Sequence, residues 1–260
     1  MAQWDLMKTE SSILIVGAVF QEIKPIIEKL DEVKKTTIGK RQVFSGKLFS
    51  QSVVIVQSGI GMLNAVQAST ALLEKMPVHL VMNTGCAGTF PDAGIEIGDI
   101  GIATKEMDIH SGLEGVSSDG LAEQLPFPLI QTENAQYYGI YPVSEHYCKM
   151  AYDILSKEFK SQNVHVKQFP FITVSTITST SQRTKRLFHA YHAGMENMEG
   201  AGIAHVALHY DKPFVEIRAA SNLVGERDKK KWQLKKAFEH SAFAVLIFLE
   251  RWADFLSISY

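Results

Sequence analysis

The amide Asn222 follows a run of residues, Phe214 to Ser221, that reads as a buried strand with one polar interruption. An ionisable acid is the more usual catalytic residue at such a place. An amide does not ionise in the ordinary pH range, so it can only donate and accept hydrogen bonds. The chemistry expected of Asn222 is therefore recognition of a polar ligand. Three charged residues follow closely, Glu226, Arg227 and Asp228. A surface turn with a local ion pair explains them as well as a catalytic role does.

Three other apolar runs end in turns that contain glycine. The turns are Gly17-Ala18-Val19-Phe20-Gln21-Glu22, Ser58-Gly59-Ile60-Gly61 and Asn83-Thr84-Gly85-Cys86-Ala87-Gly88. Ligands of open α/β sheets bind beyond the carboxyl ends of strands, and glycine lets a ligand approach the backbone closely. We therefore expect the three turns to share one site with Asn222. The glycine spacing of the second turn imitates a dinucleotide fingerprint, but packing turns explain it better because it follows the wrong strand.

The elements that must hold these turns follow from the apolar pattern. Strands are expected at residues 13–16, 53–56, 78–82, 100–103, 171–174 and from 214, and helices at 21–30, 63–74, about 198–208 and 232–252. Continuous apolar strands separated by helices indicate a sheet that is covered on both faces. The fold class is therefore an α/β sandwich, and we expect a single domain over residues 1–260. Residues 111–142 lack a clear pattern and are interpreted as an insertion near the site, either functional or mobile.

Composition excludes several classes of protein. The chain has 260 residues, 46% of them hydrophobic and 21% charged, with a formal net charge of −2 that would not recruit nucleic acid or an anionic membrane. The longest apolar run, residues 242–249, is too short to span a bilayer, and the first residues do not resemble a secretory signal. Cys86 and Cys148 have no metal-binding or disulfide spacing, which favours a reducing, cytoplasmic location. His205 and His209 have a spacing that can bind zinc, but no third ligand follows, so we expect no metal and no cofactor.

Five short motifs occur in a characteristic order. They are Gly17-Ala18-x-x-x-Glu22, Ser58-Gly59-Ile60-Gly61, Asn83-Thr84-Gly85-x-Ala87-Gly88, Gly98-Asp99 and Met198-Glu199-x-x-x-Ile203-Ala204-His205. With them the chain resembles the nucleoside phosphorylase and nucleosidase superfamily, close to the methylthioadenosine/S-adenosylhomocysteine nucleosidases. Glu196-Asn-Met-Glu-Gly200, and Ser221-Asn-Leu-Val-Gly-Glu-Arg-Asp228 followed by Trp232, resemble signatures of futalosine hydrolases, which release hypoxanthine from futalosine in menaquinone biosynthesis. The resemblance covers nearly all of the chain outside the insertion and implies a three-layer α/β/α sandwich with a central mixed sheet.

The resemblance also implies roles for individual residues. Glu22 would hold and deprotonate the attacking water, a task that suits a carboxylate with limited solvent. Glu199 would accept hydrogen bonds from both ribose hydroxyls and stabilise the sugar cation, while Met198 would lie against the sugar. The substrate-binding residues expected are Ala18, Ser58, Gly59, Ile60, Ala87, Gly88, Asn197, Met198, Ser221 and Arg227. Taken singly, Glu22 is also typical of an acid at a helix start, Glu199 of a helix cap and Met198 of a core residue.

The amide at position 222 indicates which base is bound. Adenosine-type nucleosidases generally have an aspartic acid there, whereas an asparagine can donate an N–H to purine N7 or to a 6-oxo oxygen. Asn222 therefore favours a 6-oxopurine such as hypoxanthine. Asp228, Glu226 or water would then protonate N7, and Asp228 is the first choice.

Hydrolysis is favoured over phosphorolysis. The hexameric phosphorylases carry an arginine where this chain has Asn83, and another basic residue near Glu22, and without them a phosphate site lacks its charge-assisted hydrogen bonds. The alternatives are a broader 6-oxopurine nucleosidase, a nucleoside phosphorylase, a methylthioadenosine/S-adenosylhomocysteine nucleosidase, or a nucleoside-binding protein without activity. By resemblance we expect a homodimer or a higher homo-oligomer. Cations for the aryl carboxylate of futalosine are sought among Arg183, Lys185 and Arg186.

Overall fold

The computed structural model describes residues 11–115 and 120–258, with side chains up to residue 253. The first half contains β1 (Ser12–Gly17), α1 (Phe20–Ile27), β2 (Asp31–Ile38), β3 (Arg41–Leu48), β4 (Gln51–Gln57), α2 (Met62–Leu73), β5 (Val78–Thr89), β6 (Ile100–Asp108), β7 (Leu113–Glu114) and β8 (Ala122–Glu123). The second half contains β9 (Ile130–Gln131), β10 (Gln136–Tyr137), β11 (Ile140–Pro142), α3 (Glu145–Glu158), β12 (Val166–Thr173), α4 (Ser181–Tyr191), β13 (Met195–Asn197), α5 (Gly200–His209), β14 (Phe214–Leu223) and α6 (Leu234–Ile258). Short 3₁₀ turns lie at Pro91–Ala93, Phe159–Gln162 and Lys229–Lys231.

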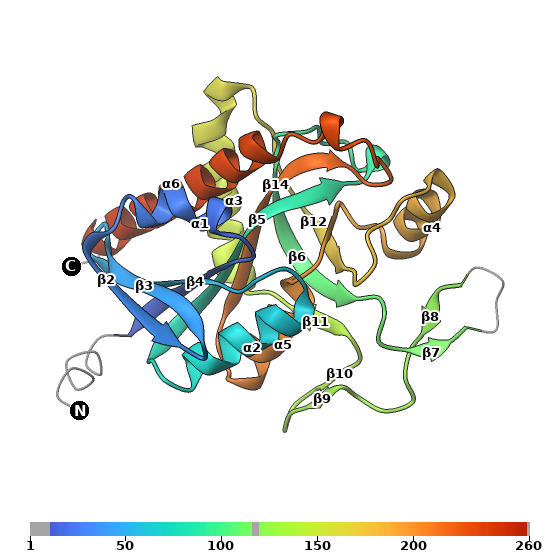
Figure 1. Cartoon of the computed structure of the whole chain (residues 1–260), viewed down its shortest axis with the longest axis horizontal. Helices are drawn as coiled ribbons and strands as arrows, with labels where there is room; N and C mark the ends of the chain where they lie inside the picture. The colour runs from blue at the N-terminus through green and yellow to red at the C-terminus, as the bar shows by residue number, and fades with distance from the viewer. Residues whose placement is uncertain (1–10, 116–119, 259–260) are drawn as a thin grey trace.

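One mixed sheet organises the described chain. Its strand order is β11-β6-β12-β13-β5-β1-β4-β3-β2, and β14 pairs with both β5 and β6. Figure 1 shows α1, α3 and α6 on one face of the sheet and α2 and α5 on the other. Every residue of β1 is buried, as expected of a central strand covered on both faces. The predicted α/β sandwich with a central mixed sheet is confirmed.

The parallel strands bring several loops to the same edge of the sheet. β1 pairs in parallel with β4 and β5, and β14 pairs in parallel with β5. The carboxyl ends of β1, β4, β5 and β14 therefore lie at neighbouring positions, as the sequence predicted. The third glycine turn, expected at residues 83–88, is wrong, because β5 continues through these residues to Thr89.

β14 contains an irregularity close to its carboxyl end. Ala220 is opposite Ala87 and Asn222 is opposite Gly88, so Ser221 is an additional residue in the ladder. Such a β-bulge changes the direction of the side chains that follow it. Both Ser221 and Asn222 are buried.

The insertion predicted at residues 111–142 has more regular structure than the sequence suggested. β7 pairs with β8 and β9 with β10 in two small antiparallel ladders, while β11 joins the edge of the main sheet beside β6. Figure 1 shows β7 to β10 standing off from the sheet at one end of the molecule. None of the helices in the described part of the chain is both long and apolar enough to cross a membrane.

Candidate active site

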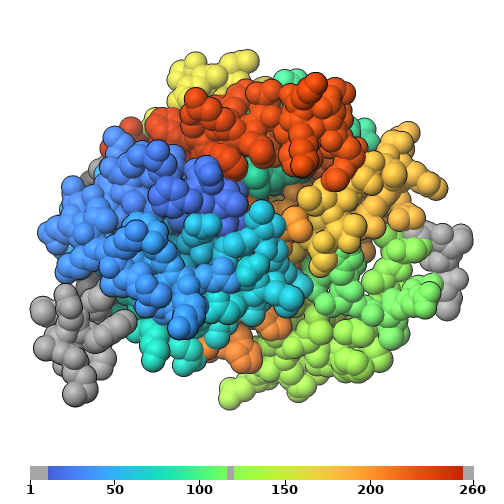
Figure 2. Space-filling view, in the orientation of Figure 1, coloured from blue at the N-terminus to red at the C-terminus, as the bar shows by residue number. Residues whose placement is uncertain are grey.

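A cavity of about 290 Å³ lies beyond the carboxyl ends of the central strands. Its lining comes from the loops after β1, β4 and β12, from the first turn of α1, from the carboxyl-terminal part of β5, from β13 and the residues before α5, from the end of β14 and from the region where α6 begins. The lining residues are Ala18, Val19, Glu22, Ile60, Cys86, Ala87, Gly88, Val174, Ile177, Glu196, Asn197, Met198, Glu199, Ser221, Asn222, Trp232, Leu234 and Phe238. In Figure 2 the N-terminal (blue), α2-side (cyan), α4-side (gold) and C-terminal (red) segments meet near the middle of the visible face.

Glu22 is held in the cavity wall by backbone amides. Its Oε2 accepts N–H bonds from Ala18 at 2.8 Å and Val19 at 3.1 Å, and its Oε1 accepts one from Cys86 at 2.9 Å. The side chain is only 2% exposed, and burial raises the pKa of its carboxyl above the ordinary value against the lowering effect of Arg218. A fixed carboxylate of raised basicity is suited to remove a proton from water.

Gly85 leaves the space that Glu22 occupies. A Cβ at position 85 would lie 2.3 Å from Oε1 of Glu22, and the backbone φ of +148° is itself one that side-chain-bearing residues rarely adopt. Gly85 thus allows the close approach of the Glu22 carboxylate to β5, where the sequence suggested close approach of a ligand.

Glu199 also lines the cavity and is bonded on both oxygens. Its Oε1 accepts the N–H of Gly61 at 2.9 Å, and its Oε2 lies 3.3 Å from Nη2 of Arg218. Arg218 is 2% exposed, and its Nη1 also donates to the carbonyl of Cys86 at 2.8 Å. This arrangement presents a buried carboxylate to the cavity without leaving its charge uncompensated.

Asn222 reaches the cavity from the bulged end of β14. Its Nδ2 donates to the carbonyl of Leu223 at 3.0 Å, and its Oδ1 accepts from the hydroxyl of Ser221 at 2.7 Å. A carbonyl oxygen can only accept, so the atom facing Leu223 must be the nitrogen, which assigns the orientation of the amide. The Ser221 hydroxyl is in turn within 3.1 Å of the carbonyl of Ala87.

Most of the residues expected at the site come together. Besides Glu22, Glu199 and Asn222, seven of the expected substrate-binding residues line the cavity: Ala18, Ile60, Ala87, Gly88, Asn197, Met198 and Ser221. Ser58 and Gly59 do not line it. The Ser58 hydroxyl is turned to the carbonyl of Gly59, and Gly59 forms the turn itself with φ of +87°.

Asp228 and Arg227 also lie outside the cavity lining. Asp228 is exposed, and its carboxylate accepts the N–H of Lys230 at the start of a short 3₁₀ turn. Aspartate commonly makes such local bonds to backbone amides, and this contact holds the side chain in the turn. The geometry gives no support to Asp228 as the group that protonates the base.

Sequence reasoning missed several lining residues. Glu196 opens one of the quoted motifs but was not assigned to the site. It is buried, its pKa is raised by burial, and its Oε1 accepts the N–H of Thr178 at 3.0 Å. Arg218, which lies behind the lining and contacts Glu199, was also missed because it is in a strand that reads as buried. The apolar residues missed are Val19, Cys86, Val174, Ile177, Trp232, Leu234 and Phe238.

Cys86 and the two histidines considered for metal binding have other surroundings. Burial raises the pKa of the Cys86 thiol well above its usual range, so the side chain is not a reactive thiolate. His205 contacts the hydroxyl of Tyr141 at 3.0 Å. Within residues 11–115 and 120–253, no three His, Cys, Asp or Glu side chains are grouped as metal ligands.

Comparison with known proteins agrees with this fold. Residues 12–250 match the Phosphorylase superfamily, and the chain belongs to that family. It is 30% identical to a 5'-methylthioadenosine/S-adenosylhomocysteine nucleosidase of Anoxybacillus flavithermus over 240 residues, covering 89% of this chain and 94% of the relative.

Solved structures of nucleosidases share the architecture. The nucleosidase of the same kind from Colwellia psychrerythraea, solved in complex with adenine, superimposes with a TM-score of 0.79 at 26% identity, covering 93% of this chain and 96% of that one. The futalosine hydrolase of Helicobacter pylori superimposes with the same TM-score at 20% identity, covering 93% and 98% of the two chains, which shows the shared fold. The predicted superfamily is thus confirmed.

Proposed function

We propose that this chain is a purine nucleosidase that hydrolyses the N-glycosidic bond of futalosine and releases hypoxanthine. The nucleosidase part of the proposal is supported by relatives and structural neighbours, all named nucleosidases or hydrolases of nucleosides. The choice of futalosine depends on one observation, the orientation of the Asn222 amide in the cavity.

The Asn222 amide suits a 6-oxopurine. One of its two N–H groups is donated to Leu223, so the second can be donated to N7 or to the 6-oxo oxygen of a base. An amide cannot transfer a proton to a leaving adenine. Hypoxanthine spreads negative charge onto its 6-oxo oxygen as it leaves, so a hydrogen bond can stabilise it without proton transfer from the protein.

Glu22 and Glu199 supply the other two requirements of hydrolysis. Cleavage of an N-glycosidic bond passes through a cationic sugar, which is attacked by water. Glu22 accepts the proton of that water. The carboxylate of Glu199 accepts hydrogen bonds from the ribose hydroxyls and stabilises the positive charge on the sugar. N7 is protonated by solvent in this scheme, because Asp228 is engaged in its own turn.

The charge of the cavity supports hydrolysis over phosphorolysis. Its lining includes the acids Glu22, Glu196 and Glu199, and no lysine or arginine is among the lining residues of the described chain. Phosphate sites usually rely on charge-assisted bonds from such cations. Asn83, at the position where hexameric phosphorylases have an arginine, instead donates to Glu216 at 2.8 Å.

A methylthioadenosine/S-adenosylhomocysteine nucleosidase is the second candidate, because the curated relatives carry that name. The two candidate enzymes would release different bases, so one assay distinguishes them. The assay measures release of hypoxanthine and adenine from futalosine, inosine and methylthioadenosine, each with and without phosphate. We expect hypoxanthine from futalosine at the highest kcat/KM, together with free sugar in the absence of phosphate.

Other outcomes would replace the proposal. Faster release of adenine from methylthioadenosine would favour the second candidate, and dependence on phosphate would indicate a phosphorylase. Nucleoside binding without release of any base would indicate a binding protein. A single domain, a homo-oligomeric state and a cytoplasmic location remain proposals beside this one.

A further inference from the structure

Two buried carboxyl groups lie behind the cavity and are not used by the mechanism above. Glu106 comes from β6 and Glu216 from β14, and neither side chain is exposed. They converge on the backbone of Gly200 at the start of α5. A Cβ at position 200 would lie 2.1 Å from Oε1 of Glu106 and 2.5 Å from Oε2 of Glu216. Position 200 must therefore be a glycine for the two acids to meet there.

Glu216 is connected to the side chain of Glu199. Its Oε1 accepts from Nε of Arg218 at 2.5 Å and from Nδ2 of Asn83 at 2.8 Å. The other end of the same guanidinium lies 3.3 Å from Oε2 of Glu199. Arg218 therefore bridges the two carboxylates, and its direction is set by Glu216 at the shorter contact.

Glu106 is connected to the backbone of Glu199. Its Oε1 accepts from Nδ2 of Asn197 at 2.5 Å, which leaves Oδ1 of the same amide directed at the start of α5. That oxygen accepts the N–H groups of Glu199 at 2.9 Å and Gly200 at 2.7 Å. One acid thus acts on the side chain of Glu199 and the other on its main chain.

The local charges require a proton on this pair. Glu22, Glu199 and Glu216 are buried around the cation Arg218, and Glu106 is buried beside it. Burial, and then the neighbouring charge of Glu216, raise the pKa of Glu106 well above its usual range. Oε2 of Glu216 is one of the few buried side-chain atoms of the described chain that lacks a hydrogen-bond partner. A proton on Glu106 gives that oxygen a donor.

We propose that Glu106 and Glu216 form a buried acid pair that shares one proton and positions Glu199, Glu216 through Arg218 and Glu106 through Asn197. Both are positioning residues, since neither lines the cavity. The inference deepens the proposed function and depends on it in one respect, the assignment of Glu199 to the ribose.

The shared proton should make the site sensitive to alkaline conditions. When Glu106 loses its proton, two adjacent carboxylates repel each other and the bond to Oε2 of Glu216 is lost. Arg218 on β14 faces both acids and Cys148 on α3 lies near Glu216, while Glu199 and Glu22 interact with Arg218. Arg218 remains charged throughout, and burial raises the pKa of the Cys148 thiol to about 12, so Glu106 is expected to lose its proton before either of them as the pH rises.

The test compares two isosteric variants. Glu106→Gln keeps a neutral side chain that can donate to Glu216, so we expect near wild-type kcat/KM for hypoxanthine release and an alkaline limb displaced to higher pH. Glu216→Gln removes the charge that directs Arg218, and we expect kcat to fall about 100-fold, more than KM changes, because a misplaced carboxylate no longer stabilises the sugar cation. Glu158→Gln, on the exposed face of α3, is the control and should change neither value.

A second measurement does not depend on activity. Infrared spectra of the wild-type protein near neutral pH should contain the band of a protonated carboxyl group, which Glu106→Gln removes and Asp99→Asn, a change at a buried acid elsewhere, leaves in place. Equal losses of activity in both glutamine variants with an unchanged pH profile would overturn the proposal, and so would a protonated band that survives Glu106→Gln. If the wild-type protein released no base from any nucleoside, the proposed function would fail, whereas the infrared result would still decide whether the pair holds a proton.

Discussion

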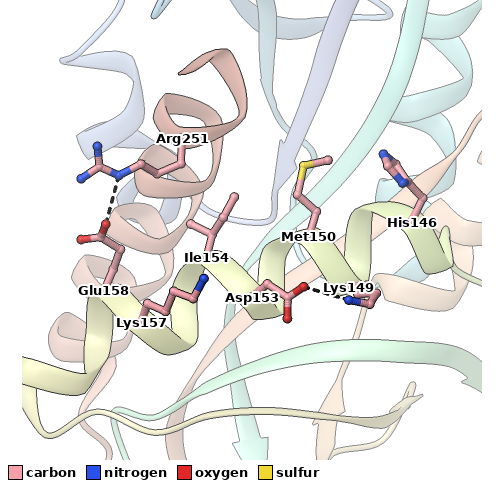
Figure 3. A pocket seen from close by; sticks show the side chains of 8 residues that line it. All are labelled: His146, Lys149, Met150, Asp153, Ile154, Lys157, Glu158 and Arg251. Atoms are coloured by element: carbon pink, nitrogen blue, oxygen red, sulfur yellow. Dashed lines mark hydrogen bonds and ion pairs between the residues drawn. The ribbon is translucent and has the colours of Figure 1, made fainter. Parts of the chain in front are cut away.

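The cavity at the strand ends and a groove between α3 and α6 differ in whether their charged side chains are buried or exposed. The groove is the larger, at about 470 Å³ against about 290 Å³, and Figure 3 shows its side chains on the outer faces of two helices. Its ion pairs are exposed. Lys149 and Asp153, for example, lie 3.0 Å apart with 79% and 52% of their side chains exposed. In the cavity, by contrast, Glu22 is almost fully buried and is held by three backbone amides.

Buried charge, more than the volume of a cavity, therefore marks the chemical site. Exposed pairs such as Arg251 with Glu158 are screened by water and contribute little. A buried carboxylate is costly unless the protein provides partners, so its presence in a cavity wall indicates a function. Four substitutions and one pH profile test this distinction.

Glu22→Gln should have the largest effect. The amide keeps the size of the side chain but cannot accept the proton of water, so we expect turnover to fall about 10²- to 10⁴-fold. Binding of hypoxanthine, measured by calorimetry, should be retained. The matched change in the groove, Glu158→Gln, should leave turnover unaltered, and equal effects of the two changes would invalidate the distinction between the regions.

Gly85→Ala should have the next largest effect. The new Cβ would lie 2.3 Å from Oε1 of Glu22, so the carboxylate must move, and a displacement of about 1 Å can lower kcat about 100-fold. Gly94→Ala is the control, since it is also at a positive φ but meets only the tip of Lys167. Similar kinetics for both variants would show that the position of Glu22 is not critical.

Asn222→Asp should change the choice of base. The acid can protonate or hydrogen-bond a 6-aminopurine, so we expect the ratio of kcat/KM for inosine to that for adenosine to fall about tenfold or more, equivalent to one changed hydrogen bond. The measurement is paired kinetics on both nucleosides. An unchanged ratio would remove the case for a 6-oxopurine.

The acid side of the pH profile should report Glu22. Its carboxyl must be ionised to act as a base, and its pKa is raised by burial. As pH falls through that raised value the active form is lost, so kcat/KM should decline about tenfold per pH unit. The decline should begin above pH 4.5, the ordinary pKa of glutamate. A decline centred at pH 4.5 would argue against burial of the Glu22 carboxylate.

Asp153→Asn should have the smallest effect. It breaks an exposed pair with Lys149, and we expect the free energy of unfolding to change by less than about 0.5 kcal/mol. Denaturant unfolding measures this, and turnover serves as a second readout. Loss of activity here would indicate a role for the groove that its exposed charges do not suggest.

The central strands could be predicted from sequence because burial on both faces makes them continuously apolar. β1 and β4 are of this kind, and they were predicted close to their true limits. β2 was missed because its residues are mostly exposed at the edge of the sheet, and β13 because it has only three residues. Apolar pattern cannot reveal a strand that lies at an edge or is very short.

The site was predictable where a side chain lies close to the carboxyl end of a strand. Asn222 is the last residue but one of β14, Glu22 lies in the first turn of α1 behind β1, and both line the cavity. Phe238 was not predictable, because it lies within α6, and the sequence does not show that α6 packs beside the cavity. Glu106 and Arg218 were concealed for a different reason: buried ionic groups inside strands look like interruptions of a core pattern, and several of their partners, such as Asn197 and Cys86, lie far away in sequence.

The bulge in β14 sets the direction of the side chain at position 222, whatever residue is there. Because the ladder with β5 fixes how residue 222 enters the cavity, an acid, an amide or a hydroxyl at that position would arrive at the same place. A change of base preference would therefore require one substitution and no rebuilding of the backbone. Deleting the additional residue in the bulge would instead turn position 222 towards the opposite face, so the length of this strand is under tighter constraint than its composition.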